Sequence, residues 1–229
     1  FKKEINKLKN KDMYYEKPKG FIPSIFHLAY QNRPGDRLIL EDFAKVISKT
    51  NGMMSNGFSR NKYLIKSSNR KNLKVGICSM FLRTNHSVGK CFLKVLKDLS
   101  DTDFDIRLYV IQDNKKHHLR KEVYSYFTKV INLPNCPKMS AEIILSDHLD
   151  LIFYPDIGMN SFSYILALSR LALVQVTGLG HGSTSGIKNI DYYITHGNEP
   201  SKSDLDYTEK LIRFRRLPFN FAIPKIDEN

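Results

Sequence analysis

Hydrophobic and polar residues follow two different patterns along the chain, and the change falls near residue 73. Beyond that point, short apolar runs with the length of strands alternate with segments whose apolar positions follow a helical period. The expected strands are 73–81, 105–112, 129–133, 149–154, 173–179 and 191–196, and the expected helices are 87–99, 117–127, 139–148 and 162–171. This alternation predicts an α/β fold, a Rossmann-like and mostly parallel sheet flanked by helices, with right-handed crossovers.

The first 72 residues have little of this regularity. One helix is expected over 37–49, where apolar residues form an approximate helical stripe. Pro34 and Gly35 mark its start, and Asn51 with Gly52 marks its end. The sequence therefore predicts two parts: a basic helical or irregular extension over 1–72, and a Rossmann-like half-domain over 73–229.

Charge is distributed unevenly between these two parts. The whole chain has a net charge of +13, and residues 1–71 hold 16 Lys or Arg against 6 Asp or Glu. Such a segment could meet RNA, a membrane surface or an acidic partner. No aromatic stacking motif accompanies the charge, so a solvated surface rich in Lys and Asn is the preferred interpretation, and nucleic acid is not an expected partner.

The remaining composition points to a cytoplasmic globular protein. No apolar stretch approaches the roughly 18 residues that span a bilayer, and the start lacks the features of a secretory signal. Three scattered cysteines, Cys78, Cys91 and Cys136, lack the spacing of a metal site and suggest a reducing compartment. The chain begins with Phe1 rather than Met, which indicates a fragment or a processed chain.

Ligands of such sheets bind beyond the carboxyl ends of the strands, near the point where the strand order reverses. That rule selects the loops 83–90, 155–160 and 178–186. The third loop holds four glycines and three hydroxyl residues, and the backbone N–H groups of such a loop can cradle an anion. The chain has neither a P-loop motif nor GxGxxG after the first strand, which disfavours dinucleotide and Walker-type binding.

His86 follows the first strand and lies beside the first turn of the next helix. A neutral imidazole there could act as a base, or hydrogen-bond a sugar or phosphate near the positive end of the helix dipole. The alternative is that Asn85 or Ser87 caps the helix and His86 is only a neighbour. His181, in the glycine-rich loop, presents the same choice, and Asp156 fits a turn-stabilising role better than a functional one.

The same loops carry a resemblance to a known family, the protein O-GlcNAc transferases, including the bacterial SPINDLY-type members. Asn85, His86 and Ser87 match the family's Asn-His-(Ser or Pro) motif. The segment LDLIFYPDIG (149–158) resembles its strand and loop, and SRLALVQVTGLGHGSTSGIKNIDYYIT (169–195) resembles its Gln, Gly-rich and Ile-Asp-Tyr pattern. The segment YTEKL (207–211) resembles the motif that follows, so order and spacing agree over 73–217.

Three positions need separate mention. Leu173 and Gly182 stand where the family has proline, which could alter rigidity at the first and loosen the sugar-side loop at the second. A further family histidine should fall near residues 24–27, where His27 is present.

The resemblance implies a GT-B arrangement, of which this sequence is the first half. In that family a UDP-sugar donor, UDP-GlcNAc, gives its sugar to Ser or Thr of a protein acceptor, and the nucleotide pocket lies mainly in the second domain. No metal ion or cofactor is expected, and this chain alone is expected to be inactive because it lacks the C-terminal nucleotide-binding domain. The catalytic residue is expected to be His86, and the expected substrate-binding residues are Asn85, Leu179, Gly180, His181, Gly182, Ser183 and Thr184.

Two alternatives remain open at this point. The first is an N-glucosyltransferase of the same fold, which adds glucose to asparagine. The second is a non-enzymatic Rossmann-like binding module with a basic arm.

Overall fold

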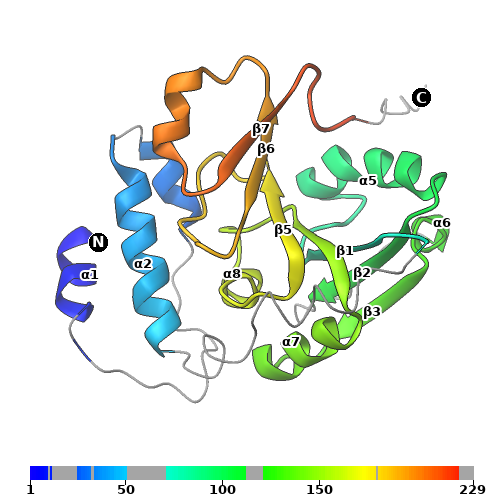
Figure 1. Cartoon of the computed structure of the whole chain (residues 1–229), viewed down its shortest axis with the longest axis horizontal. Helices are drawn as coiled ribbons and strands as arrows, with labels where there is room; N and C mark the ends of the chain where they lie inside the picture. Colours follow the sequence, from blue (N-terminus) through cyan, green and yellow to red (C-terminus); the bar gives the residue numbers. More distant parts are fainter. Residues whose placement is uncertain are drawn as a thin grey trace, which may run out of the picture.

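Seven strands form one sheet, in the order β3-β2-β1-β4-β5-β6-β7 (Figure 1). The computed structural model describes residues 1–9, 11, 25–31, 34–50, 71–111, 121–178 and 180–221. Every pairing between neighbouring strands is parallel, which confirms the α/β, Rossmann-like fold. The strands are β1 (Lys74–Ser79), β2 (Asp105–Ile111), β3 (Lys129–Leu133), β4 (Leu149–Tyr154), β5 (Ala172–Gly178), β6 (Tyr192–His196) and β7 (Lys210–Phe214).

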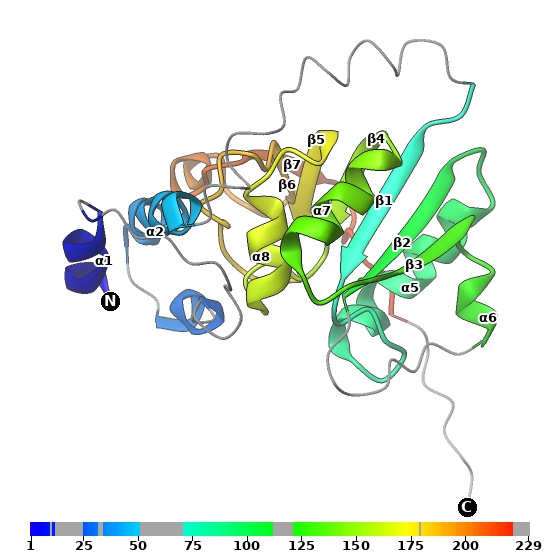
Figure 2. The ribbon, with the colours of Figure 1, turned by 90° about the horizontal axis from the view of Figure 1, so that it is seen from below.

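Helices cover the sheet in two layers, and the handedness of the crossovers decides which layer each one joins. From β1 to β3 the chain adds strands on one side of β1, and from β4 onward it adds them on the other side. Right-handed crossovers therefore place α5 and α6 on one face and α8 on the opposite face, beside α7 (Figure 2). The helices are α1 (Lys2–Leu8), α2 (Asp36–Thr50), α5 (Ser87–Ser100), α6 (Lys121–Tyr124), α7 (Pro137–Ser146) and α8 (Ser161–Ala167), with 3₁₀ helices η1 (Phe26–Gln31) and η2 (Ser201–Asp206).

Helix α2 is part of the core, although its sequence lies in the basic first third of the chain. Leu40, Phe43 and Ile47 are buried in the same apolar cluster as residues of α7 and α8. The loop after β5 packs directly on this helix, because a Cβ atom at Gly186 would lie 2.3 Å from the backbone carbon of Leu40. The division of the chain at residue 72 stays a prediction, but α2 and the sheet share one core.

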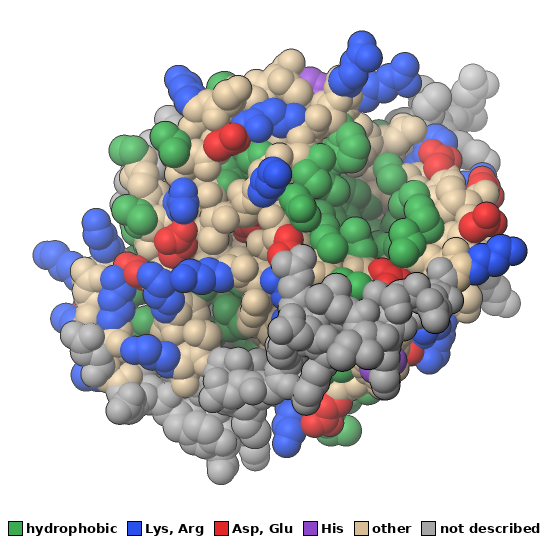
Figure 3. Space-filling model, viewed as in Figure 1, with side chains coloured by type: hydrophobic (Ala, Val, Ile, Leu, Met, Phe, Trp, Pro, Cys, Tyr) green, Lys and Arg blue, Asp and Glu red, His purple; other side chains and the backbone are tan. Residues whose placement is uncertain are grey.

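One face of the sheet carries exposed apolar side chains. The side chains of Ile212 and Phe214 in β7 lie on the α5 side of the sheet and are 36% and 46% exposed. Among the described elements no helix covers β6 and β7 on this side, because the connections from β4 to β7 return over the other face. Figure 3 shows apolar side chains gathered in a hollow between β7 and α5.

The six expected strands all form, with ends that differ by one or two residues. Two elements at the C-terminal end, η2 and β7, were not expected from the sequence. The helix expected over 117–127 is described only as α6, and its first residues lie outside the described part of the chain. No described helix is long and apolar enough to cross a membrane.

Candidate functional site

Asp156, directly after β4, organises the turn that follows the neighbouring strand β1. Its Oδ2 accepts hydrogen bonds from Ser79 Oγ at 2.8 Å, from the Met80 amide at 2.9 Å and from the Phe81 amide at 3.0 Å. Strands β1 and β4 are neighbours where the strand order reverses. The carboxylate therefore joins the expected loop 155–160 to the end of β1, just before the expected loop 83–90.

This carboxylate is completely buried, and its second oxygen, Oδ1, has no hydrogen-bond partner in the described structure. Burial raises the pKa of Asp156 from 3.8 to about 6, against the opposing effect of the three donated hydrogen bonds. The turn-stabilising interpretation of Asp156 agrees with these contacts.

His86 is itself the N-cap residue of α5, a role the sequence had suggested for Asn85 or Ser87. Its Nδ1 accepts a hydrogen bond from the Val88 amide at 3.2 Å, and its ring stacks on Phe81 with centroids 4.7 Å apart. Burial, and second the charge of Arg83, lowers the pKa of His86. The ring is thus neutral at pH 7, and because Nδ1 is the acceptor, the proton resides on Nε2. An Nε2–H group at this position can donate a hydrogen bond.

The glycine-rich loop after β5 is held tightly on two sides. At Gly180 a Cβ atom would lie 1.5 Å from the carbonyl oxygen of Pro155, so no other residue fits this path. His181 is buried, with Nε2 3.1 Å from the Phe26 carbonyl oxygen of η1 and Nδ1 3.3 Å from Ser183 Oγ. One ring nitrogen of His181 therefore attaches the loop to η1 and the other contacts Ser183 inside the loop, while its carbonyl oxygen accepts a hydrogen bond from the Tyr193 hydroxyl.

Glu209, just before β7, fixes the second half of the loop. Its buried carboxylate accepts hydrogen bonds from Thr184 Oγ1 at 2.6 Å, from the Ser185 amide at 2.9 Å and from Ser185 Oγ. The Thr208 amide donates in turn to Thr184 Oγ1 at 3.0 Å. Thr184 is buried, and among the described residues of the loop (178 and 180–186) only Gly180, Gly182 and Ser183 keep some exposure.

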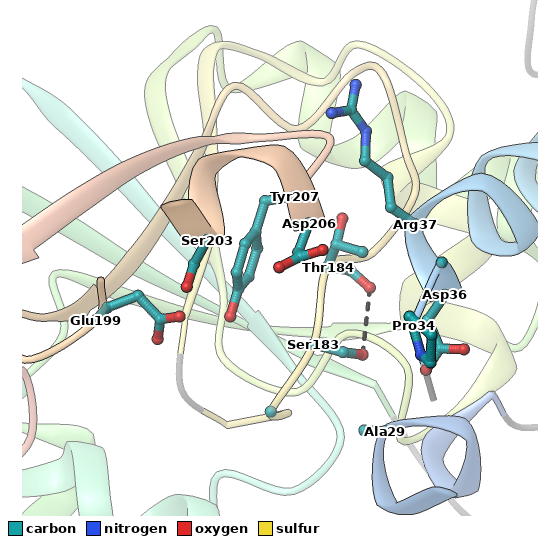
Figure 4. Close-up of a pocket in the computed structure, with 12 residues that line it drawn as sticks. Ala29, Pro34, Asp36, Arg37, Ser183, Thr184, Glu199, Ser203, Asp206 and Tyr207 are labelled. Carbon is teal, nitrogen blue, oxygen red and sulfur yellow. Dashed lines mark hydrogen bonds between the residues drawn. The ribbon is translucent and has the colours of Figure 1, made fainter. Parts of the chain in front are cut away.

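The tip of the loop, Gly182 and Ser183, borders an open cavity of about 500 Å³. One wall comes from Ala29 and residues 34–37 at the start of α2, and the opposite wall from Glu199 and η2 with Tyr207 (Figure 4). Residues 182–184 lie between the two walls. The cavity is thus built where the N-terminal helices meet the connections that follow β5 and β6.

The structure does not bring all of the expected site residues into this cavity. Gly182, Ser183 and Thr184 line it, whereas Asn85 and His86 do not. Asn85 is exposed beside the N-terminus of α5, and Leu179 lies outside the described residues. The roles expected for these residues stay predictions.

Most of the residues opposite the glycine loop were not predicted from the sequence. Tyr207 and Glu209 belong to the YTEKL segment that resembled the family, so that motif could have pointed to them. Asp36 lies more than 160 positions before the other two acidic residues of the cavity, Glu199 and Asp206. Only the fold places them together. Among the described residues, no three His, Cys, Asp or Glu side chains form a group that could hold a metal ion.

Comparisons with known proteins support the class of fold. No family model and no curated protein matches the sequence. The structure is similar to a solved glycosyltransferase structure, and its parallel sheet belongs to the Rossmann-like class. That structure is a mutant O-GlcNAc transferase from Thermobaculum terrenum, with 20% sequence identity and a TM-score of 0.58. The similarity covers 85% of this chain and 40% of that transferase, and at this identity it shows the fold.

Proposed function

We propose that the chain is the first half of a GT-B glycosyltransferase that moves a sugar, GlcNAc, from a UDP donor to a Ser or Thr side chain of a protein. The observation that carries this proposal is the junction of the loops after β1, β4 and β5 at one edge of the sheet, held together by Asp156 and Gly180. The fold shared with an O-GlcNAc transferase supports it.

His86 supplies the chemistry that the reaction needs on this side of the donor. When the bond between sugar and diphosphate breaks, negative charge grows on the leaving phosphate. A neutral His86 with its proton on Nε2 donates a hydrogen bond to a phosphate or sugar oxygen. The N-terminus of α5 beside it adds the positive end of a helix dipole. We therefore assign His86 the role of a hydrogen-bond donor rather than a base.

The glycine loop supplies the second contact with the donor. Gly182 has open space around its Cα and Ser183 lines the cavity, so backbone N–H groups and one hydroxyl are accessible there. Glu209 and His181 hold the loop from behind. This arrangement keeps the loop in place before a sugar arrives, which lowers the entropic cost of binding.

The proposal predicts that residues 1–229 alone bind UDP-GlcNAc weakly and transfer no sugar. The chain spans 40% of the similar transferase, and the proposed nucleotide pocket belongs to a second α/β unit. Radiolabelled sugar transfer to a protein extract, measured with this chain and with the full-length product of its gene, tests the prediction. Sugar transfer by residues 1–229 alone would contradict the proposal that the active site is shared between this chain and a second α/β unit.

The identity of the sugar is tested in the same assay. The full-length protein is supplied with UDP-GlcNAc or with UDP-glucose in parallel reactions. We expect GlcNAc on Ser or Thr, identified by mass spectrometry of the product. Glucose on asparagine would show an N-glucosyltransferase of the same fold, and no transfer with either donor would favour a binding module.

A further inference from the structure

The cavity beside the glycine loop carries negative charge in a protein that is strongly basic overall. Its carboxylates come from Asp36 at the start of α2, and from Glu199 and Asp206 on the opposite wall. Glu199 accepts one long hydrogen bond, 3.4 Å from Thr195 Oγ1. Asp36 and Asp206 accept none from the described residues and form no ion pair there. These three acidic residues line one cavity, and the cationic residue among the described lining residues is Arg37.

The arginines close to this cavity are already engaged elsewhere. Arg37 donates through Nε to Glu41 at 2.8 Å and through NH1 to the Leu205 carbonyl at 3.2 Å, and its guanidinium points away from the cavity (Figure 4). Arg213 donates to the carbonyl oxygens of Glu199 and Pro200 and pairs with Asp204. Both guanidinium groups are therefore bonded to other partners, although the charge of Arg213 still acts on Tyr207 and opposes the rise of its pKa.

Tyr207 adds a second and independent sign of a ligand. Its side chain is only 9% exposed, and its hydroxyl points into the cavity toward Glu199 and Ser203 (Figure 4). The hydroxyl makes no hydrogen bond with the described residues. Burial, followed by the charges of Glu199 and Glu209, raises the pKa of Tyr207, so the hydroxyl stays protonated. The hydroxyl oxygen is not one of the fully enclosed polar atoms, so it stays open to the cavity, where a water molecule or a ligand can form a hydrogen bond with it.

We propose that this cavity binds the cationic side chain of a lysine or arginine on a polypeptide. An ammonium or guanidinium group can donate to several carboxylates and to one hydroxyl oxygen at the same time, and such charge-assisted hydrogen bonds are strong. The cavity shares Gly182 and Ser183 with the glycine loop. We therefore identify that polypeptide as the acceptor of the sugar, a step that rests on the proposed function.

A sugar fits this cavity less well than a basic side chain. Sugar sites commonly offer the face of an aromatic ring, but the ring of Tyr207 packs against Tyr193, with centroids 4.8 Å apart. The chain carries a net charge of +13, so its overall field repels cations. A local group of carboxylates is what brings a basic ligand to this position in spite of that field.

The test is a binding measurement on residues 1–229 by two-dimensional ¹H–¹⁵N NMR, without any nucleotide sugar. The probe is the peptide acetyl-Gly-Ser-Lys-Ser-Gly-amide, compared with the same peptide carrying acetyl-lysine. We expect saturable shifts at Gly182, Ser183, Glu199 and Ser203 with the lysine peptide only. In the double variant Glu199→Gln, Asp206→Asn we expect binding weaker by roughly tenfold or more.

The matched control is Asp103→Asn, which removes an exposed carboxylate in the turn before β2. It should leave peptide binding unchanged, and the spectra themselves report whether each variant is folded. The proposal would be overturned if the acetylated peptide bound as tightly as the lysine peptide, or if Asp103→Asn weakened binding as much as the double variant does. Chemical-shift changes outside the cavity would overturn it too. Tighter binding of free N-acetylglucosamine, or of spermidine without any binding of the peptide, would overturn it as well.

The outcome is separable from that of the proposed function. Peptide binding in the cavity by a protein whose full-length form transfers no sugar would leave the cavity assignment standing and remove the acceptor role. Sugar transfer by a full-length protein whose cavity does not bind the lysine peptide would leave the proposed function standing and remove the cavity assignment.

Discussion

A single buried carboxylate, that of Asp156, holds the turn after β1 against the turn after β4. It accepts three hydrogen bonds through one oxygen, and its other oxygen has no partner in the described structure. At the scale of single residues, the Asp156 carboxylate and the N-cap formed by His86 determine how the candidate functional site responds to pH and to substitution.

The raised pKa of Asp156 predicts a stability that falls as the pH rises. In the folded state the carboxyl binds its proton more tightly than in the unfolded chain, whose pKa is close to 3.8. Its contribution is therefore complete below pH 3.8 and is lost as the pH rises through about 6. Asp156→Asn should flatten this dependence between pH 4 and 7, measured by urea unfolding. A slope identical to that of the unchanged protein would contradict the assignment to Asp156.

Two substitutions of His86 separate its cap from its Nε2–H group. Asparagine is a good N-cap, so His86→Asn should keep the free energy of unfolding while sugar transfer by the full-length protein falls on the order of a hundredfold. His86→Ala should lose the same activity and also about 1 kcal/mol of stability. Transfer rates and melting temperatures are measured on both variants. Near-normal transfer by His86→Asn would show that the ring serves only as a cap.

Between elements, the position of the glycine loop depends on a residue of the next connection. Glu209, directly before β7, accepts hydrogen bonds from Thr184 and Ser185 inside the loop after β5. A change at Glu209 therefore acts on a segment more than twenty positions earlier in the chain.

We expect Glu209→Ala to destabilise the protein by about 2–4 kcal/mol, because it leaves buried donors without an acceptor. The matched control is Glu142→Ala on the exposed side of α7, which should change stability by less than about 0.5 kcal/mol. Chemical denaturation of both variants measures the difference. A loss at Glu209 no larger than that at Glu142 would show that the loop does not need this carboxylate.

The difference between features formed within one element and features formed between distant elements explains what the sequence could predict. Strands β1, β2, β4 and β5 are apolar on both faces, so their positions follow from composition alone. Strand β7 alternates exposed and half-buried residues and includes Lys210 and Arg213, and this edge strand was not recognised. The glycine loop was found because glycines mark a close approach of backbone. The acidic cavity could not be found, because it unites residues that only the folded chain brings together.

At the scale of the whole molecule, the basic first third and the sheet depend on each other. Helix α2 buries Leu40, Phe43 and Ile47 in the core, and the loop after β5 packs against it through Gly186. A half-domain that begins at residue 73 would expose this apolar surface.

Removal of residues 1–50 is therefore expected to leave a chain without a stable fold. Burial of each large apolar side chain contributes roughly 1.5–3 kcal/mol, and several of them together approach the 5–15 kcal/mol that typical domains possess. The control is removal of residues 1–9, which hold the single buried residue Ile5 and should cost far less. Circular dichroism and urea titration compare the two truncations. A cooperative unfolding transition in the larger truncation would support an independent domain from residue 73.

The order of strands also has a consequence for synthesis on the ribosome. The interior strand β1 acquires β2 early, but its other neighbour, β4, begins about 70 residues after β1 ends. At 5–20 residues per second, one edge of β1 stays open for roughly 4–14 s in the growing chain. An unpaired apolar strand is a template for wrong pairing. The nascent chain thus passes through an interval in which the open edge of β1 can pair with a wrong strand.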